Sequence, residues 1–336
     1  MSAAMASADL RKCVVIGASW GGIKALQRLV AALPADLPAA VLIVQHIGAH
    51  RSQLAELLDF SGPLRAVWPS EGEEIAARTI YLAPPDRHMV LEGTRIRLLA
   101  SPKENHARPA IDPLFRSAAI TFRERCIGVI LTGLLDDGSA GLAAVKHCGG
   151  LALVQDPADA EQGDMPRNAI ANVQVDRVAP LHEMGRLIDE LARREAPEST
   201  AEPGKEVRME QELASESGGV DTLEALGRPS PLTCPDCGGT LFELTQSPPV
   251  RYRCHTGHAY TLASLAAFQR QATEDAVWTA VRALGEKLVI LQRMLGQTAP
   301  PLPQPARDEL QSEADQVALA IARLRALAEH RSGPQT

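Results

Sequence analysis

The sequence predicts an α/β protein with a doubly wound, mostly parallel sheet and helices on both faces, followed by a small zinc-ribbon module and a helical hairpin. Short apolar runs alternate with amphipathic segments through residues 10–195, which is typical of a parallel sheet covered on both faces. Cysteine and histidine pairs follow near residues 234–258, and two periodic apolar stripes come last. A chain of 336 residues suits one large domain with smaller additional parts.

The elements of the large domain are expected to alternate between strand and helix. Strands are predicted at residues 13–19, 39–47, 128–134 and 152–157, and helices at 23–33, 52–60, 112–126, 139–150 and 182–195. Residues 65–70, 79–85, 166–172 and 177–181 continue the series. Gly93-Thr94 separates residues 88–93 from 95–101, which predicts a turn between two antiparallel strands.

Residues 196–230 differ in composition from the domain of residues 10–195. They are rich in Glu, Ser, Gly and Pro and hold eight acidic residues against three basic ones. We expect an acidic, solvated linker there, with room for one short helix. A zinc-ribbon-like module is expected at residues 231–262 and a helical hairpin at residues 263–331.

The hairpin is predicted by two apolar stripes whose members recur at alternating steps of four and three residues. The stripes are Val277, Val281, Leu284, Leu288, Leu291 and Leu295, and then Leu310, Ala314, Val317, Ile321, Leu324 and Ala328. The Pro-rich residues 298–307 separate them, so we expect an antiparallel pair of helices. Each stripe must bury against the other or against another chain, and a homodimer through these helices is the alternative.

Composition excludes several classes of protein. The net charge of −7 and the few aromatic residues (five Phe, three Trp, three Tyr) argue against a nucleic-acid partner. Apolar runs are too short for an integral membrane protein, and the N-terminus lacks the pattern of an export signal. The six cysteines are not spaced like a disulfide scaffold. We therefore expect a soluble, cytoplasmic protein.

Three residues that can carry chemistry each follow a predicted parallel strand. Ser19 stands in a glycine-rich turn, GASWGG, that can push a hydroxyl outward. His46 ends the second strand, and Asp137 follows the strand at residues 128–134. Taken singly, the turn also suits a phosphate, the histidine a polar strand end, and Asp137 a turn with a helix cap.

Taken together, the three residues predict a serine hydrolase. The carboxyl ends of parallel strands open into one crevice, so Ser19, His46 and Asp137 are expected to converge. A serine hydroxyl needs an imidazole to take its proton, and the imidazole needs a carboxylate to fix its tautomer. Such a triad requires no cofactor. We expect the backbone amides of Trp20 and Leu134 to hold the oxyanion.

Six motifs carry a resemblance to a known family. They are VVIGASWGG, VLIVQHI, YLAPPDRHM, RPAIDPLF, VILTGLLDDGSAGL and QGDMPRNAI. In this order they make residues 12–191 resemble the catalytic domain of the CheB-type protein-glutamate methylesterases of bacterial chemotaxis. The resemblance implies that Ser19 is the nucleophile, His46 its base and Asp137 the orienting acid.

The resemblance also implies a reaction and partners. The family hydrolyses γ-glutamyl methyl esters on methyl-accepting chemotaxis receptors, releases methanol, and can deamidate receptor glutamines. A chemoreceptor or a related signalling protein is therefore the expected partner. The alternative is a non-catalytic or repurposed signalling scaffold that acts through the zinc ribbon and the helices.

Three features depart from the family's pattern. Trp20 stands where the family commonly has threonine, and Leu134-Leu135-Asp136 replaces the usual Met-Gly-Asn. Leu135 is the more consequential change, because glycine tolerates backbone angles that leucine resists. Only about a dozen residues precede the first strand, so a receiver-less form is expected, without control by a phosphorylated receiver in this chain.

The sequences CPDCGG and YRCHTGHAY form a pattern of metal ligands. Cys234 and Cys237 are spaced to share one tetrahedral ion, and Cys254 with His258 completes the set. Gly257 gives the turn that brings His258 back, while His255 is the competing fourth ligand. Four protein ligands imply one structural zinc ion, on which so small a module would depend to fold.

Four residues in family-like segments keep two interpretations. They are His88, His106, Arg108 and Asp112. All four are candidates to line the cleft, and Arg108 and Asp112 equally suit a buried pair and a helix N-cap.

Overall fold

The structure, a computed structural model, describes residues 10–196, 203–215, 219–244, 249–296 and 302–329. The chain divides into two compact units, Met1–Leu265 and Ala266–Thr336. The first unit holds a seven-stranded and a four-stranded sheet, and the second is helical.

All seven strands of the main sheet run parallel, in the order β3–β4–β2–β1–β7–β8–β9. Their bounds are β1 (Lys12–Ala18), β2 (Ala39–Gln45), β3 (Arg65–Val67), β4 (Thr79–Leu82), β7 (Cys126–Ile130), β8 (Leu151–Gln155) and β9 (Arg177–Ala179). β1 lies in the middle of the sheet, with β2, β4 and β3 on one side of it and β7, β8 and β9 on the other. The crevice at such a switch point is where doubly wound sheets bind ligands.

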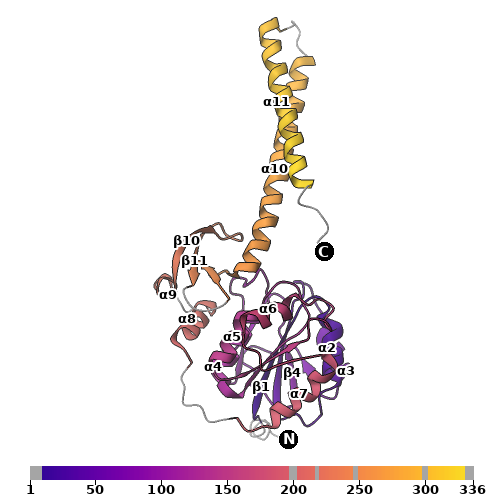
Figure 1. The fold of residues 1–336 in the computed structure, drawn as a ribbon, viewed down its shortest axis with the longest axis vertical. Helices are drawn as coiled ribbons and strands as arrows, with labels where there is room; N and C mark the ends of the chain where they lie inside the picture. Colours follow the sequence, from indigo (N-terminus) through magenta and orange to yellow (C-terminus); the bar gives the residue numbers. More distant parts are fainter. Residues whose placement is uncertain (1–9, 197–202, 216–218, 245–248, 297–301, 330–336) are drawn as a thin grey trace. The chain divides into compact units, whose positions relative to one another are not determined.

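Helices cover both faces of this sheet (Figure 1). One face packs against α4 (Ile111–Phe122), α5 (Ser139–His147) and α6 (Asp164–Asn172), and the other against α2 (Gly22–Ala31), α3 (Leu54–Ser61) and α7 (Leu181–Arg193). Every residue of β1 and β2 is buried, because apolar side chains on both faces are covered. The predicted fold class is confirmed.

Several element boundaries differ by a few residues from the expected ones, most clearly between α4 and β7 (Cys126–Ile130). The helix predicted at residues 112–126 ends at Phe122, a 3-10 turn η1 (Arg123–Arg125) follows, and Cys126 already begins β7. Separately, β5 (His88–Glu92) and β6 (Arg95–Leu99) form the expected antiparallel hairpin.

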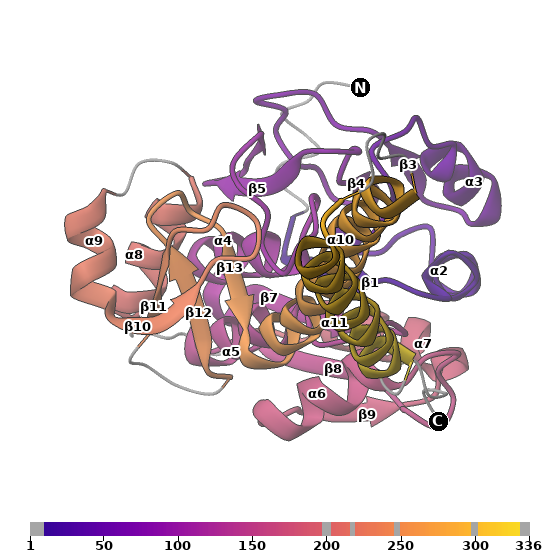
Figure 2. The same cartoon turned by 90° about the horizontal axis from the view of Figure 1, so that it is seen from above.

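Residues 203–261 form more structure than the expected linker and short ribbon. Helices α8 (Lys205–Ala214) and α9 (Val220–Leu226) lead directly into an antiparallel sheet of β10 (Gly227–Thr233), β11 (Thr240–Leu244), β12 (Arg251–Cys254) and β13 (Ala259–Thr261). Figure 2 shows α8 beside α4, in agreement with the contacts between these two helices. Two helices thus occupy part of the segment for which the acidic composition predicted a linker, while residues 197–202 and 216–218 lie outside the described residues.

In the second unit, the residues of α10 (Leu262–Gly296) from Ala266 onward and α11 (Gln304–Glu329) lie alongside each other (Figure 1). Their shared core contains most of the two predicted apolar stripes, including Val281, Leu291, Val317 and Ile321. The stripes therefore bury against each other within one chain. None of the described helices combines the length and the apolar character that crossing a bilayer requires.

A buried ion cluster explains why the acidic segment folds back onto the domain. Glu210 of α8 accepts a hydrogen bond from Arg116 of α4 at 3.2 Å, and it also pairs with Arg251. Glu104 accepts from Arg116 at 2.8 Å and from Arg253 at 2.7 Å. Glu104, Arg116, Glu210 and Arg253 are buried and each has an opposite partner, which is the condition under which buried charges are tolerated.

Substituting Glu210→Gln should lower the free energy of unfolding by about 3–5 kcal/mol, because it leaves buried guanidinium groups with too little negative charge. Urea unfolding followed by circular dichroism measures the change. Glu224→Gln, on an exposed position of α9, serves as the control and should change little. A loss below about 1 kcal/mol for Glu210→Gln would contradict this account.

Candidate active site and metal centre

Ser19, His46 and Asp137 meet at the carboxyl edge of the main sheet. Ser19 follows β1, His46 follows β2, and Asp137 lies in the loop between β7 and α5. Nδ1 of His46 lies 3.0 Å from Oγ of Ser19, and Nε2 lies 2.7 Å from Oδ2 of Asp137. The structure thus brings together the three side chains that the parallel sheet was expected to make converge.

The carboxylate sets the orientation of the His46 ring. An ionised carboxylate can only accept, so Nε2 of His46 carries the proton and donates to Asp137. Nδ1 then accepts the hydroxyl hydrogen of Ser19. The His46 side chain is 23% exposed and that of Asp137 only 4%. The imidazole of His46 is therefore reachable from solvent, while the carboxylate of Asp137 stays covered.

Side chains of neighbouring strands hold the turn that carries Ser19. Nε2 of Gln45 donates to the Ser19 carbonyl at 2.8 Å, and the Thr132 hydroxyl donates to the Trp20 carbonyl at 3.0 Å. Gly22 makes room for the first contact, since a Cβ there would lie 2.0 Å from Oε1 of Gln45. Gln45 and Thr132 are polar residues at the ends of apolar strands, which is the only sign of their role in the sequence.

The carboxylate of Asp137 is surrounded by donors from different elements. Besides His46, Oδ2 accepts the backbone amide of Ile111 at 2.7 Å. Oδ1 accepts the side-chain amide of Asn105 at 2.8 Å. Burial alone would raise the pKa of Asp137, but the hydrogen bonds from His46, Ile111 and Asn105 lower it below its usual value. The acid is therefore charged at neutral pH.

Two further carboxyl groups lie close to Asp137 and differ from it. Asp112 accepts a backbone amide of α5 at 2.6 Å and the Asn105 amide at 3.0 Å. Burial and the charge of Asp137 raise the pKa of Asp112, and burial raises the pKa of Asp136 to about 6. Of the three, Asp137 is the one whose surroundings favour the charged form, as an orienting acid requires.

The loop after β7 passes directly beside the serine. A Cβ on Gly133 would lie 2.8 Å from Cβ of Ser19, so only glycine fits at this approach. Within the part of the chain that the structure describes, neither the Trp20 amide nor the Leu134 amide donates a hydrogen bond. The two expected oxyanion donors thus belong to segments that adjoin the hydroxyl and are not used elsewhere in the fold.

Leu135 keeps a backbone conformation that suits glycine. Its φ is +61°, in the left-handed region that costs a residue with a side chain roughly 1–2 kcal/mol. Its carbonyl accepts the side-chain amide of Asn168 at 2.8 Å, which helps to hold the peptide. Leu135, at a position where the family pattern has glycine, therefore adopts a strained backbone conformation.

A shallow hollow of about 340 Å³ opens beside the serine. It is lined by Ser19 and His46 together with Trp20, Ile23 and Lys24. Trp20 is 61% exposed. Leu134, which directly follows Gly133, is 43% exposed. Large apolar side chains thus flank a reachable hydroxyl.

The residues left with two interpretations have structural contacts. His88 is buried, donates to one backbone carbonyl and accepts one backbone amide, both at 3.1 Å. Arg108 pairs with Asp86 at 2.7 Å, and His106 pairs with Asp236 at 3.2 Å. The neighbouring Asn105 is the residue that sequence reasoning missed, since nothing in its local sequence marks it as a partner of Asp137.

Cys234, Cys237, Cys254 and His258 gather at the turns of the four-stranded sheet. Their ligand atoms all lie within 4.8 Å of one another, with Sγ of Cys237 3.7 Å from Sγ of Cys254. Such spacing suits thiolates and an imidazole around one tetrahedral ion. Gly257, with φ of +109°, makes the turn before His258. His258 belongs to this cluster and the exposed His255 does not.

Replacing Asp136 by asparagine should stabilise the protein at alkaline pH. Its folded-state pKa of about 6 lies above the value of about 3.9 of an unfolded aspartate. Above pH 6 the folded chain holds a buried charge that the unfolded chain keeps in water, so this residue lowers stability there. As the pH falls toward 4, the folded state takes up the proton first and the cost disappears.

The melting temperature of Asp136→Asn should therefore exceed that of the unaltered chain at pH 8, and by much less at pH 5. The amide oxygen can still accept the Thr261 hydroxyl that Asp136 accepts at 2.7 Å. Asp221→Asn, on an exposed position of α9, is the control. An equal gain at both pH values would show that charge is not the cause.

Comparison with known proteins identifies the family of the α/β domain. Residues 14–188 match the family model described as CheB methylesterase. A putative protein-glutamate methylesterase/protein-glutamine glutaminase of Leptospira interrogans is 38% identical over 178 residues, which are 52% of this chain and 92% of that protein. The protein-glutamate methylesterase/protein-glutamine glutaminase 2 of Anaeromyxobacter dehalogenans is 40% identical over 192 residues, 57% of this chain and 56% of that protein.

A solved structure agrees with the sequence relatives. The CheB methylesterase catalytic domain of Thermotoga maritima aligns with a TM-score of 0.52 and 33% identity, over 54% of this chain and 98% of that one. The family model spans just over half of the chain, and it contains Ser19, His46 and Asp137. The chain therefore belongs to the CheB methylesterase family.

Proposed function

We propose that the chain hydrolyses γ-glutamyl methyl esters of chemoreceptors or related signalling proteins, and deamidates glutamine side chains of the same proteins. The observation that carries the proposal is the hydrogen-bonded chain from Ser19 through His46 to Asp137, at the edge of a hollow open to solvent. The names of the Leptospira and Anaeromyxobacter relatives support both reactions.

The hydrogen bonds suggest how the acyl transfer proceeds. Oγ of Ser19 attacks the side-chain ester carbonyl while Nδ1 of His46 takes its proton. The bond to the methoxy group then breaks, and methanol leaves with that proton. A water molecule, deprotonated by the same nitrogen, attacks the acyl-enzyme and releases the glutamate carboxyl group and Ser19. With a glutamine substrate the leaving group is ammonia.

Asp137 and two backbone amides stabilise the charges that form during this reaction. The Asp137 carboxylate stabilises the imidazolium that forms when His46 is protonated. The amides of Trp20 and Leu134 are the proposed donors to the tetrahedral oxyanion, because they flank Ser19 and have no hydrogen-bond acceptor within the described residues.

The surface around the serine suits a helical protein substrate. Trp20, Ile23 and Leu134 are apolar and at least 43% exposed. On a helical substrate, the residues three and four positions from a glutamyl ester lie beside it, and apolar side chains at those positions can contact this surface. We place this reaction in the cytoplasm. The chain spans about half the length of relatives such as that of Anaeromyxobacter.

Ser19→Ala should lower the rate of methanol release from a methylated chemoreceptor fragment by about 10³–10⁶-fold, because among the described residues Ser19 supplies the hydroxyl that hydrogen-bonds to His46. Methanol is measured by a coupled oxidase assay. Ser70→Ala, at an exposed position away from the hollow, should keep the full rate. Equal rates for Ser19→Ala and the unaltered chain would disprove Ser19 as the nucleophile, and no methanol release by the unaltered chain would favour a scaffold function.

We also propose that the Cys234, Cys237, Cys254 and His258 cluster holds one zinc ion. The set is closed, with three sulfur ligands and one nitrogen ligand, as in structural zinc sites. Although burial opposes it, the backbone amide of Gly239 and the Thr256 hydroxyl help to lower the pKa of Cys237, which favours the thiolate that binds metal. A bound ion would cross-link the turns of the four-stranded sheet.

The purified protein should contain about one zinc ion per chain, measured by inductively coupled plasma mass spectrometry. Cys254→Ala should remove it, since three remaining ligands bind far more weakly. Cys148→Ala is the matched control, because that cysteine is buried in the α/β domain outside the cluster. Full zinc content in Cys254→Ala would disprove the assignment.

A further inference from the structure

Residues 101–107 lie between the four-stranded sheet and the catalytic acid. Here "the metal module" means residues 227–265, which carry the four-stranded sheet and the first turn of α10. The amide of Asn105 donates to the carbonyl of Ala259 in β13 at 2.7 Å, and the Ala259 amide donates to the Lys103 carbonyl at 3.3 Å. The loop that carries Asn105 is thus paired with a strand of the metal module.

The side chain of Asn105 connects the metal module to the acid. Its Oδ1 accepts the backbone amide of Thr261 at 3.0 Å and the Ser264 hydroxyl at 3.0 Å. Its Nδ2 donates to Oδ1 of Asp137 at 2.8 Å and to Asp112 at 3.0 Å. Because the Thr261 amide can only donate, the amide group of Asn105 has one possible orientation. The NH₂ group is thereby aimed at the two carboxyl groups.

A second contact joins the same two parts. The Thr261 hydroxyl donates to Oδ1 of Asp136 at 2.7 Å, next to the catalytic acid in the chain. Thr261, Ser264 and Asp136 are all at most 3% exposed. Hydrogen bonds buried this deeply are not exchanged readily for water, so they fix the position of their partners.

The conformation of the loop shows that it needs external support. Asn105 and His106 have φ values of +49° and +61°, both in the left-handed region. Residues with side chains rarely hold such angles unless neighbouring groups stabilise them. The metal module supplies part of that support through Ala259 and through Asp236, which pairs with His106.

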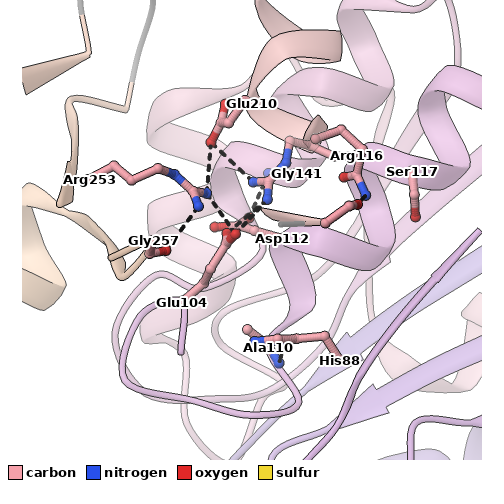
Figure 3. Close-up of polar contacts among 12 residues, drawn as sticks. His88, Glu104, Ala110, Asp112, Arg116, Ser117, Gly141, Glu210, Arg253 and Gly257 are labelled. Atoms are coloured by element: carbon pink, nitrogen blue, oxygen red, sulfur yellow. Dashed lines mark hydrogen bonds and ion pairs between the residues drawn. The ribbon is translucent and has the colours of Figure 1, made fainter. Parts of the chain in front are cut away.

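The buried ion cluster also holds the loop of residues 101–107, through Glu104. Figure 3 shows Glu104 and Glu210 facing the guanidinium groups of Arg116 and Arg253. Burial alone would raise the pKa of Glu104, but Arg116 and Arg253 lower it, so it stays charged. Arg253 belongs to β12 and directly precedes the metal-cluster residue Cys254. The residue before Asn105 is therefore also bound to the metal module.

We propose that Asn105 is a positioning residue for the catalytic acid and that the metal module, through Thr261 and Ser264, keeps it in place. The proposal rests on the esterase function proposed above. Bound zinc would then affect catalysis indirectly. It would stabilise the turns of the metal module, and the metal module holds Asn105, which donates a hydrogen bond to Asp137. The rate of turnover becomes dependent on metal content although no ligand touches the substrate site.

The first test compares variants on both sides of the contact. Asn105→Ala removes the donor, and Thr261→Val removes the hydroxyl bonded to Asp136 and to Ser264. Each should lower kcat of methanol release by about tenfold to 10²-fold with little change in KM, because the acid is displaced and the substrate surface is not. Thr261→Ser keeps the hydroxyl and should recover most of the rate. Thr240→Val, at an exposed position of β11, is the control.

Zinc content and melting temperature of each variant separate positioning from misfolding. Variants that retain one zinc per chain and a nearly unchanged melting temperature, yet lose kcat, support the proposal. Normal kcat in Asn105→Ala with the metal retained would overturn it. A loss of zinc in Thr261→Val would move the decision to Asn105→Ala, whose substitution leaves all four ligands and the residues next to them unaltered.

The second test removes the metal from the full chain. A chelator should release zinc, detected with a colorimetric indicator, and lower kcat of the unaltered chain by about tenfold or more; added zinc should restore it. In Asn105→Ala the same treatment should cause a much smaller further loss, because the contact is already broken and the two effects are not additive. Independent, multiplying losses would contradict the proposal.

The controls distinguish failure here from failure of the proposed function. If the unaltered chain hydrolyses the ester, Ser19→Ala does not, and zinc release leaves kcat unchanged, the esterase function stands and the link through Asn105 is wrong. If the unaltered chain shows no hydrolysis at full zinc content, the esterase function is wrong and this proposal falls with it.

Discussion

The proposed mechanism depends on keeping one buried carboxylate, that of Asp137, charged. Asp137 must be ionised to fix the tautomer of His46, yet burial favours its neutral form. The fold solves this with donors from separate elements: His46 after β2, Ile111 at the start of α4 and Asn105 in the preceding loop. The position of each donor depends on the packing of its own element. The chemistry of Ser19 is therefore sensitive to parts of the molecule that never contact it.

The same requirement explains why the neighbouring carboxyl groups differ. Asp112 lies near Asp137 and accepts from the same Asn105 amide, but burial and the adjacent charge raise its pKa. One carboxyl group of this pair is driven toward the neutral state and the other toward the charged state, which avoids two adjacent buried charges. The Asn105 amide can donate to both, so it stabilises the pair without adding charge.

The sequence predicted the parts of the site that follow from a repeating rule. Strand ends of a parallel sheet meet at one edge, so Ser19, His46 and Asp137 could be placed together, and the spacing of Cys234 and Cys237 predicted their cluster with Cys254. Asn105 could not be found, because its partner Thr261 is 156 residues away and no local pattern marks either residue. The acidic composition near Glu210 predicted a solvated linker, because buried partners such as Arg116 become visible only in three dimensions.

The metal module lies outside the region that the family model matches. The match ends at residue 188, so Arg253, Thr261 and Ser264 lie outside the region that the family model describes. These residues nevertheless contact Glu104, Asp136 and Asn105 inside the matched region. In this chain the environment of the catalytic acid is therefore completed by residues beyond the shared domain. The proposed link through Asn105 would make Asp137 depend on residues outside the matched region, with Ser19 and His46 themselves unchanged. So small a sheet buries little apolar surface, so the zinc ion proposed for its cysteine and histidine cluster would supply stability that the link to Asp137 requires.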